Sequence, residues 1–498
     1  MPRGKSRRSH RQARWGRDRL VAIWVAGLLG AFAAGLYWFA PPAAPPDPET
    51  TAADARSQRL PAEISVSGSK PAAKRLASPP SKFEPLYARL LALEQGGAVP
   101  VTILHLGDSH IAADRITGEV RRLLQARFGD AGRGLMMPGF PFRYYQAPGF
   151  SFDQTGAWSV ANALRDDGIY GITGVSLTAD APDATLTLTS TAGPFAAAEV
   201  SLLAGPGRGR AAIAAGNLRK EVASAADEAS VLRVRLPVEA SQLKIEVLGD
   251  GPVTVLGWST EASGGGVRYV NLGIPGATVL TTRRFDEALA ASDIAALAPK
   301  LVILGYGTNE GFNDDLDLRV YEQEYERLLA LVKEAAPDAA ILVLGPFDSS
   351  RLPRFVTGEA RAAVPCRPLE PDETADYGAL LAREDSALAR WHAPPKLDQV
   401  RALLARVADR HGAAYWDLKR VMGGACSIHD WANSSPPLAL SDHVHLSDEG
   451  SRRMGRVMYE TLMAGYDRYR QQVDLGSQFA ATGAKTSETS GTILKGAP

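Results

Sequence analysis

The chain has 498 residues, of which 45% are hydrophobic and 22% charged, so it can bury at least one large core and is not a wholly disordered protein. Its length predicts about two to four domains. Lysine and arginine together number 55, as do aspartate and glutamate, and this formal net charge of zero excludes a strongly basic nucleic-acid binder.

The first predicted element is a membrane-spanning helix over residues 20–40. These 21 residues carry no charge and, as a helix, would span about 30 Å, the thickness of a bilayer's hydrocarbon core. The basic segment 1–19 holds eight basic side chains and one acidic one, which predicts a cytoplasmic N-terminus and an exported remainder. A cleaved signal peptide is the alternative, disfavoured by the length of the run and by Pro41 and Pro42 after it. The residues beyond position 40 include 47 basic and 54 acidic ones, a net charge of −7.

Three further segments follow in chain order. Residues 41–82 contain nine prolines among Ala, Ser and charged residues, a composition typical of an extended linker. In residues 83–148, a helical pattern, the apolar run Val101 to Leu106 and a second amphipathic pattern predict helix, strand and helix. Residues 149–264 show short alternating runs separated by Gly, Pro, Asp and Asn, which predict an inserted all-β domain, a sandwich or jelly roll.

Helices and strands alternate again in residues 265–473. Strands are predicted at 269–272, 301–305, 341–344 and 414–418. This alternation predicts an α/β fold, a parallel sheet flanked by helices that binds ligands at the carboxyl ends of its strands. The α/β domain is therefore discontinuous, formed by 83–148 and 265–473 around the β insertion. Residues 474–498 are rich in Gly, Ser, Thr and Ala without apolar period, and are predicted to be a disordered tail.

The chemically informative residues lie in segments that follow predicted strands. Segment 107–110, GDSH, precedes a helix, where backbone N–H groups favour negative charge; an ordinary helix N-cap is the alternative. Segments 271–277 and 305–310 offer glycine N–H groups and an asparagine amide, donors suited to a developing oxyanion, although each alone also fits an ordinary turn. In segment 441–447, SDHVHLS, an aspartate precedes a histidine by three positions and can orient it as the base for a serine.

Together, and in this order, the four segments resemble the signature blocks of the SGNH (GDSL-like) hydrolase family. The resemblance covers residues 83–148 and 265–473 and implies a flavodoxin-like parallel sheet. It also implies a catalytic triad, in which Ser109 is the nucleophile, His445 the general base and Asp442 the residue that orients His445.

The same resemblance implies an oxyanion hole. Its donors would be the backbone N–H groups of Ser109 and Gly276 and the side-chain amide of Asn309. Gly273 competes with Gly276 for this role, and the spacing of the family motif favours Gly276.

A narrower resemblance is to the family's bacterial peptidoglycan O-acetylesterases, exported enzymes with a carbohydrate-binding-module-like β domain inserted between the serine and glycine blocks. The similar stretches are LHLGDSHIAAD, FGDAGRGL, GTNE, GGACSIHDW and DHVHLSDEG. The resemblance implies a serine esterase without cofactor or metal that removes O-acetyl groups from peptidoglycan or a related envelope glycan. The insert would bind glycan or serve as a structural lid; Trp158, Tyr170 and Trp258 are candidates for stacking on sugars or for the core. The membrane helix, the linker and the cysteines depart from these relatives.

Export behind one helix, combined with a glycan substrate, predicts a single-pass inner-membrane protein. The N-terminus would be cytoplasmic and the catalytic domain periplasmic. The expected partners are an O-acetylated glycan and the membrane, and nucleic acid is not expected. Cys366 and Cys426 both fall on the exported side, where a disulfide is permitted, although two buried free thiols would give the same sequence.

Other functions compete with the esterase. An O-acetyltransferase could use the same triad on peptidoglycan or an exported polysaccharide, and a non-catalytic glycan-binding scaffold is further removed. A lipase is disfavoured because no long apolar lid segment is present. A metal site is disfavoured because it would leave the glycine and asparagine segments unexplained; it would combine His105, Asp108, His110, Asp442, His443 and His445. His443 competes with His445 as the base but directly follows Asp442.

Overall fold

The computed structural model describes residues 80–143, 145–358, 361 and 363–490, with side chains described as far as Leu475. All of these residues belong to one compact unit of the chain. The predicted membrane helix, residues 20–40, and nearly all of the predicted linker lie outside the described residues. Among the residues that are described, no helix combines the length and the apolar character needed to cross a membrane.

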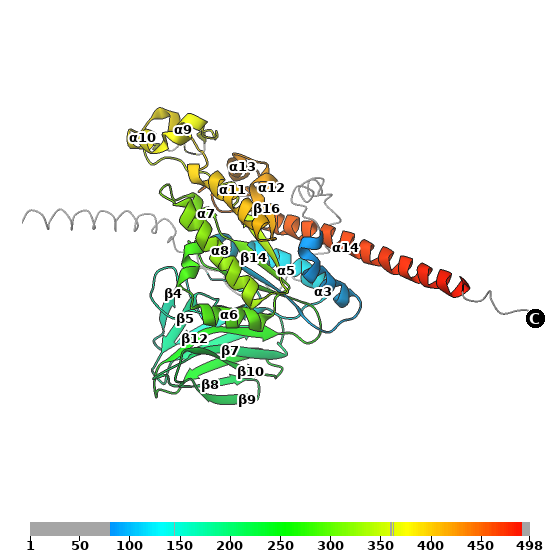
Figure 1. Ribbon diagram of the computed structural model, residues 1–498. Helices are drawn as coiled ribbons and strands as arrows, with labels where there is room; N and C mark the ends of the chain where they lie inside the picture. The colour runs from blue at the N-terminus through cyan, green and yellow to red at the C-terminus, as the bar shows by residue number, and fades with distance from the viewer. Residues whose placement is uncertain (1–79, 144, 359–360, 362, 491–498) are drawn as a thin grey trace, which may run out of the picture. The chain divides into compact units, whose positions relative to one another are not determined.

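A five-stranded parallel sheet forms the centre of the α/β domain (Figure 1). Its strands, in spatial order, are β13 (Val267–Gly273), β1 (Val101–Gly107), β14 (Leu301–Gly305), β15 (Ala340–Gly345) and β16 (Ala414–Asp417). Every neighbouring pair is parallel. All seven residues of β1 are buried, as expected for a strand covered on both faces. The predicted α/β class with a parallel sheet is confirmed.

Helices cover both faces of this sheet. Alternate residues of β1 contribute to two cores, Leu104 and Leu106 to one and Val101 and Ile103 to the other. The first core includes side chains of α6 (Glu287–Leu297), α8 (Leu318–Ala335) and α11 (Pro395–Arg410), and the second those of α3 (Glu84–Glu94), α5 (Arg115–Phe128) and α14 (Asp448–Ser490). The short helices are η1 (Pro80–Phe83), α4 (Ser109–Ala112), η2 (Val279–Arg284), α7 (Thr308–Gly311), α9 (Pro371–Ala375), α10 (Tyr377–Ala382), η4 (Ser386–Leu388), α12 (Leu418–Met422) and α13 (Ser427–Ala432).

The insertion consists of two antiparallel sheets. One has the order β10 (Ser230–Leu236), β7 (Ala197–Ala204), β12 (Val253–Glu261), β5 (Val175–Ala179) and β4 (Ser159–Asn162), with β2 (Gly134–Met136) also paired to β12. The other has the order β3 (Phe150–Thr155), β6 (Thr185–Ser190), β11 (Gln242–Val247), β8 (Arg210–Ala215) and β9 (Leu218–Ala223). Residues of both sheets, such as Leu202 and Ile245, share one buried core, so the insert is a β-sandwich.

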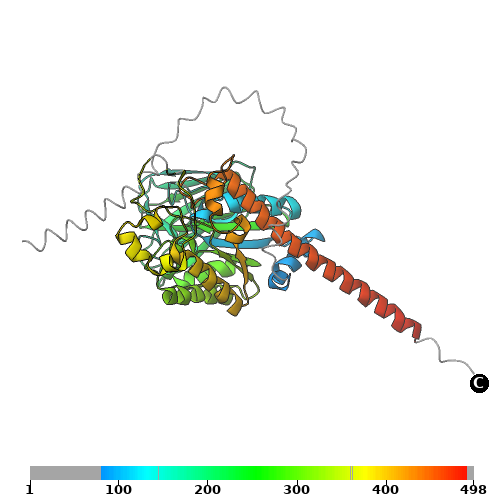
Figure 2. The same cartoon turned by 90° about the horizontal axis from the view of Figure 1, so that it is seen from above.

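Two boundaries differ from the prediction. The chain enters the β-sandwich at β2, before the predicted boundary at residue 148, because a three-residue strand is too short to show alternation. The predicted disordered tail from residue 474 is wrong as far as Ser490, where helix α14 ends (Figures 1 and 2). Extending a helix that tertiary packing has already nucleated costs little, so α14 continues into sequence with no apolar period of its own.

Candidate active site

Ser109 lies where β1 leads into the short helix α4. Asp108 is the N-cap residue, and its carboxylate accepts a hydrogen bond from the backbone N–H of His110 at 2.9 Å. The preceding Gly107 has no room for a side chain, because a Cβ would lie 2.6 Å from Ile111 Cγ1 and 2.8 Å from the Gly305 carbonyl oxygen. The glycine therefore allows the turn to pack closely on the neighbouring strand while Ser109 stays partly exposed.

The structure brings the three predicted triad residues together, although 336 positions separate the serine from the histidine. Ser109 Oγ lies 2.9 Å from His445 Nε2, and His445 Nδ1 lies 2.7 Å from Asp442 Oδ2. The other carboxylate oxygen, Oδ1, accepts the backbone N–H groups of Val444 at 2.8 Å and His445 at 2.9 Å. Because the carboxylate accepts from Nδ1–H, Nε2 carries no hydrogen and can take the serine proton.

The electrostatic environment keeps Asp442 ionised. Burial raises the pKa of this carboxyl, but the hydrogen bonds and charge of His445, with the backbone N–H groups of Val444 and His445, together lower it below its ordinary value. The side chains of His445 and Asp442 are 24% and 36% exposed, so a substrate can reach the pair from solvent.

The predicted oxyanion donors lie at the ends of β13 and β14. Asn309, in α7, donates one amide hydrogen to the carbonyl of Ala277 at 2.8 Å and has a second to offer. Within the described part of the chain, the N–H groups of Gly276 and Ser109 donate to no protein acceptor. Gly273 is buried and its N–H contacts Asn271 Oδ1 at 3.3 Å, so the geometry favours Gly276 as the donor.

Glu310 is a functional residue that the sequence did not single out. Its side chain is 1% exposed, and Oε1 accepts the backbone N–H of Val279 at 2.7 Å. This bond ties the segment after Gly276 to the helix that carries Asn309. Burial raises the pKa of Glu310 to about 7, against a lowering by its backbone hydrogen bonds. The signal in the sequence that could have pointed to this residue is its place directly after Asn309 in the GTNE motif.

A second overlooked group supports the turn that carries Ser109. Asn271 Nδ2 donates to the carbonyl of Ile111 and to Asp114 Oδ1, both at 2.8 Å. Arg121 binds the Asp114 carboxylate through two nitrogens at 3.0 and 2.8 Å, and Arg133 lies 3.1 Å from it. Asp114 itself adopts a left-handed φ of 51°, directly before α5. Buried charge thus fixes the junction between α4 and α5.

The remaining histidines have other partners. His110 places Nδ1 3.2 Å from Asp108 Oδ1 and Nε2 3.1 Å from the Val444 carbonyl. Burial lowers the pKa of His110, but Asp108 and Val444 raise it above the ordinary value, consistent with two N–H donors. His443 hydrogen-bonds His429 at 3.1 Å instead of reaching Ser109. Among the described residues, no three His, Cys, Asp or Glu side chains are grouped to hold a metal.

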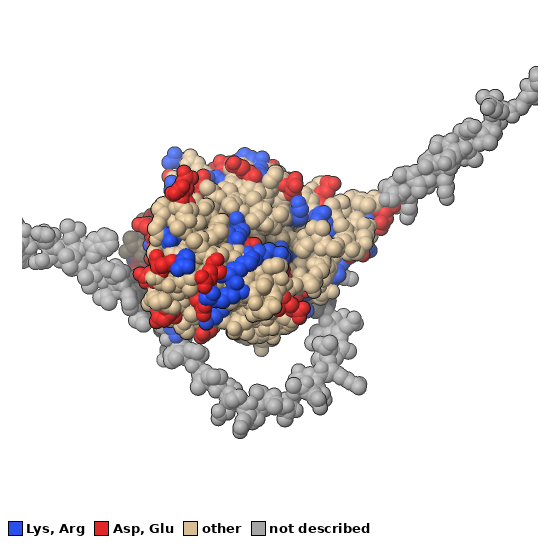
Figure 3. All heavy atoms as spheres, turned by 90° about the horizontal axis from the view of Figure 1, so that it is seen from below, with Lys and Arg blue, Asp and Glu red and all other residues tan. Residues whose placement is uncertain are grey.

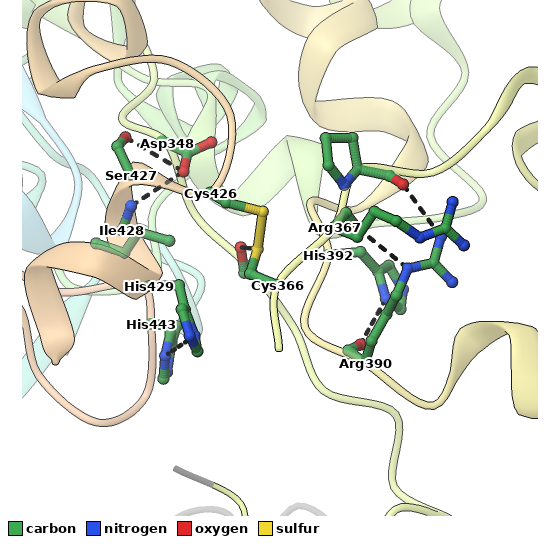
Figure 4. Close-up of a disulfide and its surroundings, with 12 residues drawn as sticks. Asp348, Cys366, Arg367, Arg390, His392, Cys426, Ser427, Ile428, His429 and His443 are labelled. Atoms are coloured by element: carbon green, nitrogen blue, oxygen red, sulfur yellow. Dashed lines mark hydrogen bonds between the residues drawn. A yellow bond between two sulfur atoms is a disulfide. The ribbon is translucent and has the colours of Figure 1, made fainter. Parts of the chain in front are cut away.

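Cys366 and Cys426, the two candidate disulfide residues, are joined by a disulfide bond (Figure 4). The bond connects the long segment between β15 and α11 to the start of α13. Both elements lie next to the loop that carries Asp442 and His445, since the carbonyl of His443 accepts the N–H of Ser350 at 2.8 Å.

The β-sandwich reaches the oxyanion segment. A Cβ built on Gly276 would lie 3.4 Å from Leu164 Cδ2, in the loop after β4. At the other end of β4, Trp158 borders a hollow of about 400 Å³, whose lining residues are Ala157, Trp158, Ser159, Thr178, Ala179, Asp180 and Pro252. Trp158 is half-buried, whereas Tyr170 and Trp258 are fully buried in the core and present no face to a ligand.

The α/β core carries the Ser109–His445–Asp442 line just beyond the carboxyl ends of its strands, an arrangement found in serine hydrolases. Residues 249–453 match the model of the GDSL-like Lipase/Acylhydrolase family, which confirms the resemblance to SGNH (GDSL-like) hydrolases. A solved peptidoglycan O-acetylesterase shares the fold with a TM-score of 0.63 and 24% identity, over 77% of this chain and 96% of that one.

Other solved structures align less well. A putative GDSL-like lipase from Parabacteroides merdae aligns over 40% of this chain and 73% of its own, with 18% identity and a TM-score of 0.26. A family two carbohydrate esterase from Clostridium thermocellum, in complex with cellohexaose, aligns over 67% and 100%, with 12% identity and a TM-score of 0.26. No curated protein matches the sequence.

Proposed function

We propose that this protein is a serine esterase that removes O-acetyl groups from peptidoglycan or a related cell-envelope glycan, anchored in the inner membrane with its catalytic domain in the periplasm. The observation that carries the esterase activity is the continuous hydrogen-bonded line from Ser109 through His445 to Asp442. This is the arrangement that converts a serine hydroxyl into a nucleophile.

The reaction proceeds in two halves. Ser109 Oγ attacks the acetyl carbonyl while His445 Nε2 takes its proton, and the resulting oxyanion accepts hydrogen bonds from the donors at Gly276, Asn309 and Ser109. The intermediate collapses to acetyl-serine, and His445 returns the proton to the departing sugar oxygen. Water, deprotonated by His445, then attacks the acetyl group and releases acetate and Ser109.

Two observations support a glycan as the substrate, and a third disfavours nucleic acid. A structure with the same fold is that of a peptidoglycan O-acetylesterase. Leu164 of the insert lies at the oxyanion segment, and strand β4 leads from there to the hollow beside Trp158. An aromatic residue among polar lining residues such as Thr178 and Asp180 suits a sugar. On the face in Figure 3, basic and acidic side chains are interspersed, a charge distribution unlike the uniformly basic surface that binds nucleic acid.

The location rests on sequence and on the disulfide. The basic segment 1–19 and the apolar run 20–40 favour a cytoplasmic N-terminus with an exported catalytic part. A disulfide between Cys366 and Cys426 suits an oxidising compartment such as the periplasm. Protease added to spheroplasts should therefore digest the catalytic domain, and complete protection of that domain would contradict the proposed location.

The deciding experiment measures acetate released from O-acetylated peptidoglycan by the detergent-solubilised full chain. We expect release by the wild type and none by Ser109→Ala. Equal release by both proteins would refute the proposal. A second arm adds a chitooligosaccharide acceptor and an acetyl donor, because the triad alone does not select water over a sugar hydroxyl; acetylated sugar without acetate would assign the O-acetyltransferase instead.

A further inference from the structure

The disulfide Cys366–Cys426 fastens a tryptophan next to the catalytic loop. Cys366 and Trp391 are paired in an isolated parallel bridge. Around it, the N–H of Trp391 donates to the carbonyl of Pro365, and the N–H of Arg367 donates to the carbonyl of Trp391, both at 3.0 Å. Any displacement of Cys366 is therefore transmitted to Trp391 through adjacent backbone hydrogen bonds.

Trp391 stacks on His443, the residue between Asp442 and Val444 in the catalytic loop. The two ring centroids are 3.7 Å apart, and the side chains are buried, with 4% and 3% of their surface exposed. His429 adds a second ring, 5.1 Å from that of His443 by centroid. Figure 4 shows His429 and His443 together beside the disulfide, and His429 belongs to α13, the helix that Cys426 caps.

The hydrogen bonds of the two histidines run in one direction. His443 Nδ1 faces the carbonyl of Ser441 at 3.1 Å and must donate. In the neutral ring, Nε2 then accepts from His429 Nδ1 at 3.1 Å. His429 Nε2 in turn accepts from the amide of Asn433 at 3.2 Å. A neutral His443 ring agrees with its pKa, which burial lowers from its ordinary value.

The backbone of His443 requires such support. Its φ is 57°, in the left-handed region that residues with side chains rarely adopt unless their surroundings hold them there. Asp442 precedes it directly, and His445 follows two positions later. A change of φ at His443 would therefore turn the Asp442 carboxylate away from His445 and His445 away from Ser109.

We propose that Trp391, His443, His429 and the disulfide Cys366–Cys426, here termed the loop clamp, position the Asp442–His445 pair against Ser109. The loop clamp touches neither substrate nor reacting atoms, so its members are positioning residues. The inference rests on the proposed function only in requiring that Ser109 acts as a nucleophile. It assigns the disulfide a role in turnover beyond its contribution to stability.

The test compares four variants of the full chain with the wild type: Trp391→Leu, Trp391→Phe, the double variant Cys366→Ser with Cys426→Ser, and Trp416→Leu. Trp416 is a matched control, because it is also a buried tryptophan, 2% exposed, and its ring packs on Phe83, whereas that of Trp391 packs on His443. Hydrolysis of p-nitrophenyl acetate gives kcat and KM, and thermal melting gives Tm. All assays are run well below the lowest Tm.

We expect Trp391→Leu and the double cysteine variant to lower kcat by roughly ten- to a hundredfold with little change in KM, as small misplacements of catalytic groups do. Trp391→Phe, which keeps a stacking face, should restore most of kcat. Trp416→Leu should lower Tm without lowering kcat. Combining Trp391→Leu with the cysteine changes should add little, because both act through the same loop clamp. Folded Trp391→Leu and cysteine variants with the wild-type kcat would overturn the proposal.

A second measurement is independent of the natural substrate. A fluorophosphonate probe labels Ser109 when the serine oxygen attacks phosphorus, fluoride leaves and His445 takes the proton. We expect slower labelling of Trp391→Leu and of the double cysteine variant. If O-acetylated glycans are not hydrolysed but labelling still depends on Trp391, the proposed substrate fails and the loop clamp stands. Equal labelling rates in all folded variants would refute the loop clamp.

Discussion

Asp442 accepts three hydrogen bonds, and the one from His445 Nδ1–H leaves Nε2 as the imidazole nitrogen that faces Ser109. In Asp442→Asn, the side-chain amide can donate to Nδ1 and so place the proton on Nε2, which can then no longer act as a base. We expect kcat for p-nitrophenyl acetate to fall by roughly a thousandfold or more, with Tm little changed. Asp448→Asn, at a carboxylate whose side chain is 63% exposed, is the control. Activity of Asp442→Asn within a few-fold of wild type would contradict the assigned tautomer.

Glu310 should make stability fall as pH rises. Its pKa is raised to about 7 in the folded protein and is near 4.5 in the unfolded chain, so between these values the folded state holds a proton that the unfolded state has lost. The resulting stabilisation of the folded state is fully present below pH 4.5 and is lost by about pH 7. The free energy of unfolding changes by about 3 kcal/mol over this range. Glu310→Gln removes the titration.

Urea unfolding at pH 5 and pH 8 checks this prediction for Glu310. The buried His105 and His392, with pKa values lowered to about 3 and about 4, act in the opposite direction in both proteins. The informative quantity is therefore the difference between wild type and Glu310→Gln. From pH 5 to pH 8, we expect the free energy of unfolding of the wild type to fall relative to that of Glu310→Gln. If the difference between the two proteins is the same at both pH values, Glu310 is not buried as a neutral acid.

At the residue scale, the sequence singled out the three residues that the structure brings together and missed those that support them. Ser109, Asp442 and His445 lie in segments that resemble the signature blocks of a known family, and that resemblance implied their roles. Glu310 and Asn271 act on backbone groups 31 and 160 positions away, and no local pattern records such contacts. Their roles follow from tertiary packing, which a single sequence does not display.

The junction of α4 and α5 depends on one buried carboxylate. Asp114 is fully buried and neutralises Arg121 and Arg133, whose side chains are 10% and 5% exposed. Asp114→Ala would leave both guanidinium groups without this partner, so we expect the free energy of unfolding to fall by about 3 to 5 kcal/mol. Urea denaturation of the wild type and of Asp114→Ala measures this fall. Asp317→Ala, which removes an exposed helix cap, should cost far less, and equal losses would contradict the importance of burial.

Elements were predicted well where they are long and periodic. The predicted strands of the α/β sheet overlap the observed ones, because buried parallel strands appear as apolar runs. Strand β2 was missed because it has three residues and is recognised only through its partner β12. The helical course of residues 474–490 was missed because it follows from the packed part of α14 and not from local pattern.

The insert and the α/β domain should act together on large substrates. If the hollow beside Trp158 holds part of a glycan, Trp158→Ala should raise KM for O-acetylated peptidoglycan by about two- to tenfold, the worth of one aromatic contact. KM for p-nitrophenyl acetate, which is too small to span from Ser109 to the insert, should not change. Trp158→Phe should retain most of the affinity. If wild type and Trp158→Ala have equal KM values for O-acetylated peptidoglycan, the insert serves as a structural lid and not as a glycan-binding domain.

For the whole molecule, the sequence predicted the architecture but not how its parts meet. The discontinuous α/β domain and the inserted β domain were visible as a change of periodicity. The approach of Leu164 to Gly276 was not, because it joins residues more than a hundred positions apart through packing alone. The membrane helix stays a prediction, since residues 20–40 lie outside the described residues.

The 336 positions between Ser109 and His445 also set an order of events during synthesis. A nascent chain presents its nucleophile first, but β1 must wait for β13 and β14 before it has neighbours to pair with. At about 5 to 20 residues per second, the acid–base loop leaves the ribosome roughly 17 to 67 s after the serine. Throughout that interval the growing polypeptide carries an unactivated serine, so a truncated translation product that ends before Asp442 would lack the proposed base and its partner and would be catalytically silent.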